Sequence, residues 1–446
     1  MLKKFTKRRE EVNLIDYKNY FNLSSELAQY IEEAEERALP HYKELGTRVF
    51  YNQEKVLNAF KEFRVSEFFF SGSTGYGYGD CGRDALESIY SLIFGTEDSL
   101  VRMQFASGTH AIALCLFSLL DPGETLLSVT GPPYSTLQKV IGLRGERKEG
   151  TLLDKGIKYQ EVSLDSRGKI DFPSLEARLR QSPRLVLLQR SRGYSWRPSV
   201  SLEEIKKVSE LIKKVSPASI FFVDNCYGEF VNIKEPTEKG ADLLAGSLIK
   251  NPGGGLAPLG GYVAGQKKLI EKVADRLTAP GLGKEVGASL NINRAFYQGL
   301  FLAPHMVGEA IKSAVFAASL FEEMGFEVSP RYDEMRSDIV QAIKFDDPDL
   351  LLSFCRGIQR RGPVDSFITP EPGWMPGYDD KIVMAAGTFN QGASLELTAD
   401  APFVAPYIVY LQGGLTYEHG KLGIIEGAKE VFKLLNRNKI NVKNQG

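Results

Sequence analysis

Two ionisable residues in the segment 221–265 each follow a short apolar run, where a charged side chain needs a specific role. Asp224 ends the run SIFFV, whose β-branched and aromatic residues predict a buried strand. Lys250 ends the run LLAGSLI and is followed by Asn-Pro and three glycines. The spacing leaves room for one crossover between neighbouring strands, so we expect both residues at adjacent strand ends.

The chemistry of this pair is that of an acid and an activated amine. A buried carboxylate needs a partner because burial of a bare charge is costly. A lysine near low dielectric is expected to have a depressed pKa, which frees its amine to act as a nucleophile or a base. The pair suits a cofactor with a basic ring nitrogen at one side and an aldehyde at the other, a description that fits pyridoxal phosphate.

A second group of candidates, Ser107, Gly108 and Thr109, stands between a predicted strand at 100–104 and a predicted helix at 110–120. Small and hydroxylated residues at a helix start form an anion site, because free N–H groups and the positive dipole end face outward. The same residues could serve only as a helix cap. A nucleotide P-loop is excluded in the glycine-rich segment after Lys250, because no Lys-Ser/Thr pair follows those glycines.

Three further segments carry candidate site residues. Tyr134 follows Gly-Pro-Pro at an expected strand end, and the loop QRSRGYSWRP brings Arg190 and Arg192 to another. Tyr76 and Tyr78 lie in the glycine-rich stretch SGSTGYGYGD, which is either a simple turn or a loop that reaches a site. Arginines on an exposed loop are usually solvated, so a solvated loop remains the alternative for Arg190 and Arg192.

The surrounding pattern predicts an α/β fold in which strands and helices alternate. Predicted strands at 124–129, 157–162, 185–188 and 220–223 alternate with predicted helices at 136–143, 172–179 and 202–215. Ser201 and Glu204 form a capping box at the start of the last of these helices. Such alternation indicates a mostly parallel, doubly wound sheet that binds ligands at the carboxyl ends of its strands.

We expect three parts in the chain. Residues 1–65 predict a helical amino-terminal arm, with a face of Leu27, Tyr30, Ile31, Ala34 and Ala38, that packs elsewhere, for example on a second subunit. Residues 66–325 form the large domain. Residues 326–446 form a smaller α+β domain, with strand-like runs at 381–386, 394–397 and 408–411 and a final helix at 427–435.

Composition narrows the class of protein. The 446 residues are 43% hydrophobic and 25% charged, and 55 basic residues nearly balance 56 acidic ones, which gives nucleic-acid binding no electrostatic support. The amino terminus lacks the apolar core of a secretory signal, and the longest apolar run, 111–120, is too short to span a bilayer. The four cysteines show no paired spacing for zinc or disulfides, so we expect no metal and a cytoplasmic location.

These motifs resemble a known family. VDNCY with GADLLAGSLIKN resembles the fold-type I pyridoxal-phosphate enzymes of cysteine and methionine metabolism. Four further segments are similar to the methionine gamma-lyase-like family, whose members are often labelled aluminium-resistance proteins. They are SGSTGYGYGD, QFASGTHAI, TGPPYSTL and YIVYLQGGLTYEHGKLGI. The likeness runs essentially the full length and implies the fold-type I transferase fold.

The resemblance implies roles for individual residues. Lys250 would form the Schiff base, and Asp224 would pair with the pyridinium nitrogen. Tyr134 would stack on the ring face and could protonate a leaving thiolate. Apart from the resemblance, Arg190 and Arg192 stay candidates for a contact with the substrate because of their place on the loop at a strand end. The phosphate would be held by a group of small residues, namely Ser107, Gly108, Thr109 and Ser247.

Two departures from the family pattern concern partners of the cofactor and the substrate. Tyr76 or Tyr78 would reach the site of a neighbouring subunit in a homodimer or homotetramer, although the arginine of the family's Tyr-x-Arg pair is missing. Lys421 aligns with the family arginine that binds the substrate carboxylate, and it offers a point charge instead of a two-pronged fork.

The resemblance implies a carbon–sulfur lyase that acts on cystathionine, methionine or cysteine by β- or γ-elimination. A pyridoxal-phosphate aminotransferase or aldolase is the second hypothesis. A non-catalytic stress protein that keeps the fold is the third, and the presence of both Asp224 and Lys250 argues against it.

Overall fold

The first part of the chain that the structure describes is helical. The structure, a computed structural model, describes residues 15–146 and 149–443. Helix α1 (Tyr17–Phe21) precedes the 38-residue helix α2 (Ser25–Glu62), which contains Pro40. The predicted face is present, since Leu27, Ile31, Ala34 and Ala38 are buried, and α2 packs along α9 (Asn293–Glu323) of the same chain. Residues 1–14 of the predicted arm lie outside the described residues.

The large domain is built on a seven-stranded sheet with the order β1-β7-β6-β5-β4-β2-β3. Only β7 runs antiparallel to its neighbours, so the prediction of a mostly parallel sheet is confirmed. The strands, in chain order, are β1 (Asp98–Arg102), β2 (Thr125–Ser128), β3 (Lys158–Glu161), β4 (Leu185–Gln189), β5 (Ile220–Asp224), β6 (Leu243–Ser247) and β7 (Gly261–Gly265).

Helices cover both faces of this sheet, because alternate residues of each strand point into two different cores. On β5, Phe222 joins the core under α4, α5 and α8, whereas Phe221 and Val223 join the core under α3, α6, α7 and α9. The helices not yet bounded are α3 (Cys81–Phe94), α4 (Gly108–Leu119), α5 (Ser135–Ile141), α6 (Phe172–Leu179), α7 (Leu202–Val215) and α8 (Lys267–Leu277). Short 3-10 turns lie at η1 (Glu67–Phe70), η2 (Pro236–Lys239), η3 (Asn251–Gly253) and η4 (Gly283–Glu285).

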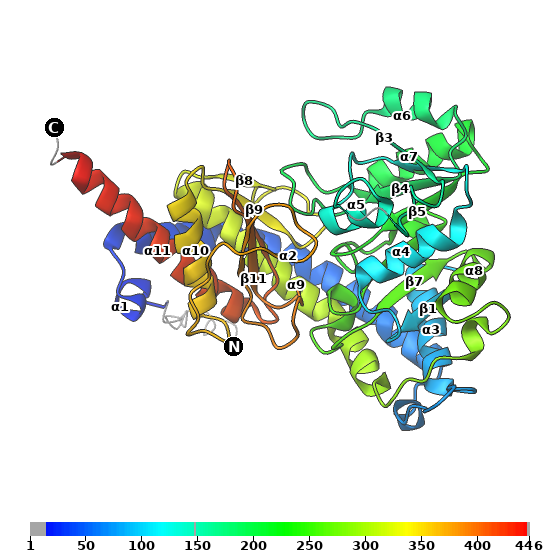
Figure 1. Ribbon diagram of the computed structural model, residues 1–446. Coiled ribbons are helices and arrows are strands. Elements are labelled where there is room, and N and C mark those ends of the chain that lie inside the picture. Colours follow the sequence, from blue (N-terminus) through cyan, green and yellow to red (C-terminus); the bar gives the residue numbers. More distant parts are fainter. Residues whose placement is uncertain (1–14, 147–148, 444–446) are drawn as a thin grey trace, which may run out of the picture.

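The small domain holds a five-stranded antiparallel sheet with the order β10-β11-β12-β9-β8. Helices α10 and α11 share its core with the end of α9 and the start of α2. Figure 1 shows this domain on the left, with α2 and α9 running from it into the large domain on the right. The elements are β8 (Glu327–Ser329), β9 (Gln341–Lys344), α10 (Pro348–Arg360), β10 (Ile382–Ala385), β11 (Thr398–Pro402), β12 (Ile408–Gln412) and α11 (Tyr417–Lys443).

Most predicted elements of the large domain lie within two residues of the observed ones, and the Ser201–Glu204 capping box is present. The small domain was less predictable. The expected strand at 394–397 is wrong: the chain there is a loop in which the Glu396 carboxylate accepts the N–H groups of Phe389 (2.7 Å) and Asn390 (3.1 Å).

One core helix has the composition of a membrane span. Among the described residues, α9 is the single helix long and apolar enough to cross a bilayer, and 72% of its most apolar window is buried inside the protein. Such burial is what the central helix of a folded domain shows, so its length and composition are weak evidence for a span.

Candidate active site

The site forms where the parallel strands of the large domain end side by side. The register aligns Gln189 of β4 with Asp224 of β5, and Asp224 with Ala245 of β6. Asp224 is 4% exposed, and one of its carboxylate oxygens accepts the N–H of Cys226 at 3.1 Å. Burial raises the pKa of Asp224, an effect that the nearby Lys250 only partly opposes.

Lys250 lies just after β6, at the start of a tight turn. A Cβ atom added to Gly253 would lie 1.7 Å from the Leu248 carbonyl oxygen, so the turn requires glycine there. The Lys250 ammonium lies 3.9 Å from the centre of the Tyr227 ring, within the range of a cation–π contact. Tyr227 itself has a φ of 70°, a left-handed conformation that few residues other than glycine adopt.

The charge on Lys250 differs from the sequence expectation. Burial alone lowers the pKa of the Lys250 ammonium. Cys226, Tyr227 and Asp224 oppose that effect electrostatically, and the net direction is a pKa well above the ordinary value for lysine. The expected depressed pKa is therefore wrong, because acidic groups from β5 and the turn that follows it surround the amine. Among the described residues, Lys250 and Asp224 form no direct ion pair.

The residues predicted to form an anion cradle lie at the start of α4. Ser107 is the N-cap, and its hydroxyl accepts the N–H of His110 at 3.1 Å. A Cβ atom added to Gly108 would lie 3.0 Å from the Ser247 Cβ, so the helix start packs directly against the end of β6. The N–H groups of Gly108 and Thr109 have no partner among the described contacts and remain available to an anion.

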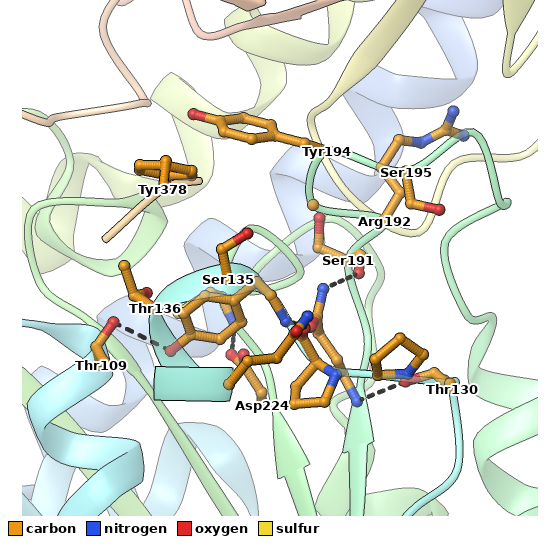
Figure 2. A pocket seen from close by; sticks show the side chains of 18 of the residues that line it. Thr109, Thr130, Ser135, Thr136, Ser191, Arg192, Tyr194, Ser195, Asp224 and Tyr378 are labelled. Atoms are coloured by element: carbon orange, nitrogen blue, oxygen red, sulfur yellow. Dashed lines mark hydrogen bonds between the residues drawn. The ribbon is translucent and has the colours of Figure 1, made fainter. Parts of the chain in front are cut away.

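Tyr134 closes the cradle from a third element, the start of α5. Its hydroxyl donates to the Thr109 hydroxyl at 3.1 Å, a bond drawn as a dashed line at Thr109 in Figure 2. Its backbone N–H donates to the Gln189 side-chain oxygen at 3.0 Å, which ties the loop before α5 to the end of β4. Burial raises the pKa of the Tyr134 phenol well above 10, and the charge on Asp224 adds to the effect.

These residues line one cavity of about 730 Å³. The sequence-predicted residues on its wall are Ser107, Gly108, Thr109, Tyr134, Arg192, Asp224, Ser247 and Lys250. They come from the ends of β4, β5 and β6 and from the starts of α4 and α5, which no single stretch of sequence could bring together. Their placement is that expected of a site at the carboxyl edge of a doubly wound sheet.

Arg190 does not line this cavity and is fully buried. Its guanidinium donates to the Asn225 side chain at 2.7 Å and to the Asn232 side chain at 2.8 Å, and it lies 3.7 Å from the Glu235 carboxylate. The predicted substrate contact is therefore wrong for Arg190. Its role is to brace the turn after β5 that carries Tyr227.

Lys421 also lies elsewhere, on α11 of the small domain, and is 9% exposed. Its ammonium donates to the Tyr17 hydroxyl and to the Glu35 carboxylate. These bonds fasten α11 to α1 and α2. The predicted contact with a substrate carboxylate is wrong for Lys421 because the cation is already paired.

Arg192 lines the cavity and is 2% exposed. Two of its guanidinium nitrogens, Nε and Nη1, have no hydrogen-bond partner. Figure 2 shows the side chain extending away from Asp224, on the same side of the cavity as Ser195. Two buried guanidinium nitrogens without hydrogen-bond partners are costly, so Arg192 is the residue of the arginine-rich loop that is suited to an anionic ligand.

Tyr76 and Tyr78 lie outside the cavity of their own chain. They are 71% and 62% exposed, and their rings stack with centroids 5.4 Å apart. Their loop is nonetheless ordered: the Asp80 carboxylate caps α3, and the Tyr76 carbonyl accepts the Gly287 N–H at 2.9 Å. The loop therefore presents two stacked aromatic side chains outward on a braced support.

Sequence reasoning missed several residues of the wall. Tyr227 follows Asp224 closely, and its place in VDNCY was a usable signal. Tyr194 and Tyr378 are far apart in the chain, yet their rings stack with centroids 5.6 Å apart at the top of Figure 2.

Among the described residues, no group of three or more His, Cys, Asp or Glu side chains could hold a metal ion.

The wall fits pyridoxal phosphate by its donor chemistry. Free N–H groups and hydroxyls at the start of α4 suit a phosphate, a buried carboxylate suits a ring nitrogen, and Lys250 suits the aldehyde. A doubly wound sheet with a small carboxyl-terminal domain that carries this set has the fold of the fold-type I pyridoxal-phosphate enzymes. The Escherichia coli pyridoxal-phosphate-dependent protein YhfS shares the fold at 19% identity, with a TM-score of 0.57 over 86% of this chain and 95% of its own.

Within that class, residues 27–432 match the methionine gamma-lyase family, and the chain belongs to it. It is 50% identical over 382 residues to the Bacillus subtilis protein YnbB. The match covers 86% of this chain and 91% of YnbB. It is 49% identical to a carbon–sulfur lyase involved in aluminium resistance from Clostridium novyi, with a TM-score of 0.89 over 93% of this chain and 98% of that one. The family resemblance seen in the sequence motifs is confirmed.

Proposed function

We propose that the protein is a pyridoxal-phosphate-dependent carbon–sulfur lyase that cleaves a sulfur amino acid by β- or γ-elimination. The observation that carries the proposal is the convergence of Lys250, Asp224 and the cradle at Ser107–Thr109 in one cavity. The name of the Clostridium novyi relative, a carbon–sulfur lyase, supports the reaction class.

When bound, pyridoxal phosphate supplies an electron sink for the carbanion formed at the substrate Cα atom. Asp224, a buried carboxylate at the end of β5, would pair with the ring nitrogen and keep a proton on it. Lys250 would hold the aldehyde of the cofactor through its amine and, in its unprotonated form, would take up the Cα proton of the substrate. The Tyr227 ring lies 3.9 Å from the amine and holds it in place between proton transfers.

Tyr134 favours elimination over transamination, because elimination needs a proton donor beside the departing sulfur. Burial keeps the Tyr134 pKa well above 10, so the phenol retains its proton throughout the working range. An unperturbed phenol has a pKa close to that of a thiol, so a proton would pass between them at little cost. The raised pKa of Tyr134 makes transfer of its proton to the thiolate less favourable. Tyr134 would stabilise the leaving thiolate by turning its hydroxyl from Thr109 to the sulfur and donating a hydrogen bond there, because full transfer of its proton is uphill.

Arg192 is the proposed contact for the substrate carboxylate, since its buried guanidinium carries two nitrogens without partners. Replacement by glutamine should raise KM for an amino-acid substrate and leave the affinity for the cofactor unchanged. An unchanged KM would assign Arg192 to the packing of its loop.

The reaction is tested with the purified protein, added pyridoxal phosphate, and cysteine, cystathionine or methionine as substrate. A lyase releases a keto acid together with sulfide or a thiol. Borohydride should fix the cofactor on a peptide that contains Lys250, and Lys250→Ala should abolish both label and turnover. Lys268→Ala, a change of an exposed lysine on α8, is the matched control.

Other outcomes separate the alternatives. Formation of a keto acid that depends on an added acceptor keto acid, without thiol, would identify an aminotransferase. Carbon–carbon cleavage would identify an aldolase. Cofactor binding without turnover of any amino acid would leave a non-catalytic stress protein with this fold, and a label on another lysine would overturn the site itself.

We propose in addition a composite site in a homodimer or homotetramer, because Tyr76 and Tyr78 point outward on a braced loop. A Lys250→Ala subunit mixed with a subunit carrying Tyr76→Phe and Tyr78→Phe should regain activity through one intact site. A monomer by sedimentation, with no complementation, would contradict this. The four free cysteines suit the reducing cytoplasm that we propose as its location.

A further inference from the structure

A loop of the small domain reaches over the cavity and touches the large domain. The loop precedes β10 and places Tyr378, Asp379 and Asp380 on the cavity wall. The Tyr378 ring stacks on Tyr194, which belongs to the large domain, with an interplanar angle of 29°. The two rings lie one beside the other across the cavity from Asp224 in Figure 2. One wall of the site therefore depends on where this loop lies.

The backbone of the loop packs tightly on α5, the helix that begins beside Tyr134. A Cβ atom added to Gly377 would lie 2.3 Å from the Thr136 methyl carbon, and Gly377 has a φ of 97°. No other residue type fits this approach without displacing the loop or the helix. The contact brings the next residues of the loop to the charged end of α5.

Asp379 completes this contact with two ion pairs. Its carboxylate oxygens lie 3.2 Å from the Lys139 ammonium and 3.2 Å from the Arg144 guanidinium. A hydrogen bond from Lys139 holds the pKa of Asp379 below its ordinary value, and Arg144 adds to the effect. The three side chains are between 33% and 47% exposed, so the pairs are screened by salt and each is individually weak.

We propose that Asp379 is a positioning residue that latches the loop 374–381 to α5 and so holds Tyr378 as a wall of the substrate site. The inference rests on the proposed function for its effect on turnover, and on geometry alone for the latch. Weak, exposed pairs suit this task, because a loop that admits substrate has to open at little cost. Substrate held under the latch is enclosed by residues of both domains.

The kinetic test compares Asp379→Asn with the wild type on the amino acid that is turned over best. The variant should raise KM by about fivefold, the value expected when exposed ion pairs are lost, and change kcat by less than about twofold. Raising the salt concentration should increase the wild-type KM toward that of the variant and leave the variant unchanged. Asp379→Glu should recover part of the affinity.

Glu176→Gln is the matched control, because it breaks an exposed ion pair with Arg180 on α6, away from the cavity. It should leave KM and its salt dependence unchanged. Equal KM values for Asp379→Asn and wild type, or equal salt dependence, would overturn the proposal. A loss of kcat with KM unchanged would also overturn it, since the latch is proposed to affect substrate binding and not the chemical step.

A second readout does not need turnover, so failure of the lyase proposal and failure of the latch are distinguishable. The chain has two tryptophans, and Trp374 lies on the loop itself. In a Trp196→Phe background, time-resolved fluorescence anisotropy of Trp374 should report slow tumbling with the whole protein. Adding Asp379→Asn, or salt, should introduce a fast local component. Identical decays in both proteins would refute the latch whatever the reaction.

Discussion

A buried carboxylate beneath the site, Glu229, should make the stability of the protein depend on pH in an unusual direction. Glu229 follows β5 and is fully buried. One oxygen accepts the Tyr262 hydroxyl at 2.9 Å, and the other has no partner. Burial raises the pKa of Glu229 to about 8, against the lowering effect of that hydrogen bond. At neutral pH the folded protein therefore holds this group as a neutral acid.

The sign of the effect follows from proton linkage. Above the ordinary glutamate pKa of 4.5 the unfolded chain has lost this proton, whereas the folded protein keeps it up to about pH 8. The contribution to stability is full below pH 4.5 and is lost as the pH rises through the folded pKa. Each pH unit in that window costs about 1.4 kcal/mol, so Glu229 removes about 4 kcal/mol between pH 5 and pH 8.

The perturbation is Glu229→Gln, which keeps an acceptor for Tyr262 and cannot ionise. The variant should match the wild type near pH 5 and exceed its free energy of unfolding by about 3 to 4 kcal/mol near pH 8. The measurement is urea unfolding followed by circular dichroism at pH 5, 6.5 and 8. Glu271→Gln, a change of an exposed residue on α8, is the control and should show no such divergence.

Parallel stability curves for Glu229→Gln and wild type would refute the reasoning, because they would mean that Glu229 ionises equally in both states. A variant that is destabilised at every pH would show that the amide cannot be accommodated at this buried position. In that case Tyr262→Phe provides the second test: loss of the bond that lowers the Glu229 pKa should extend the loss of stability to higher pH.

Two further predictions concern the cavity. Tyr134→Phe keeps the ring and removes the hydroxyl bonded to Thr109. Thiol release should fall by about 10²-fold, the lower range for loss of a proton donor, while cofactor binding and exchange of the Cα proton survive. Unchanged thiol release would assign Tyr134 to packing alone. Gly108→Ala places a methyl group 3.0 Å from the Ser247 Cβ. The affinity for pyridoxal phosphate, measured by absorbance titration, should fall by about tenfold for a strain of about 1–2 kcal/mol. Unchanged affinity would mean that the cradle does not hold the cofactor.

The sequence by itself determined the large domain and the chemistry of its strand ends. Alternating apolar runs and helical periods are local signals, and they placed the parallel strands within two residues of their observed bounds. Asp224 and Lys250 stood out because each ends a run that has to be buried. Ser107 to Thr109 stood out because a helix start exposes N–H groups wherever it lies.

Only the tertiary structure decided which charged side chains are free. Arg190 and Lys421 look like ligand-binding cations in the sequence, but partners distant in the chain, among them Glu235 and Glu35, already neutralise them. The pKa of Lys250 is raised because acidic groups from β5 and the turn after it surround the amine. Pairing and electrostatic fields act across space, so composition and spacing do not reveal them.

The small-domain wall of the cavity was likewise settled by packing. Tyr378 and Asp379 stand in a glycine-containing loop with no periodic signal, and their partners Tyr194 and Lys139 belong to another domain. The strand pattern of the small domain is weaker as well, because each of its strands is short and pairs antiparallel. Local residue patterns thus predicted the candidate site residues at the strand ends, such as Asp224 and Lys250. The packing of the small domain against the large one determined that Tyr378 and Asp379 enclose them.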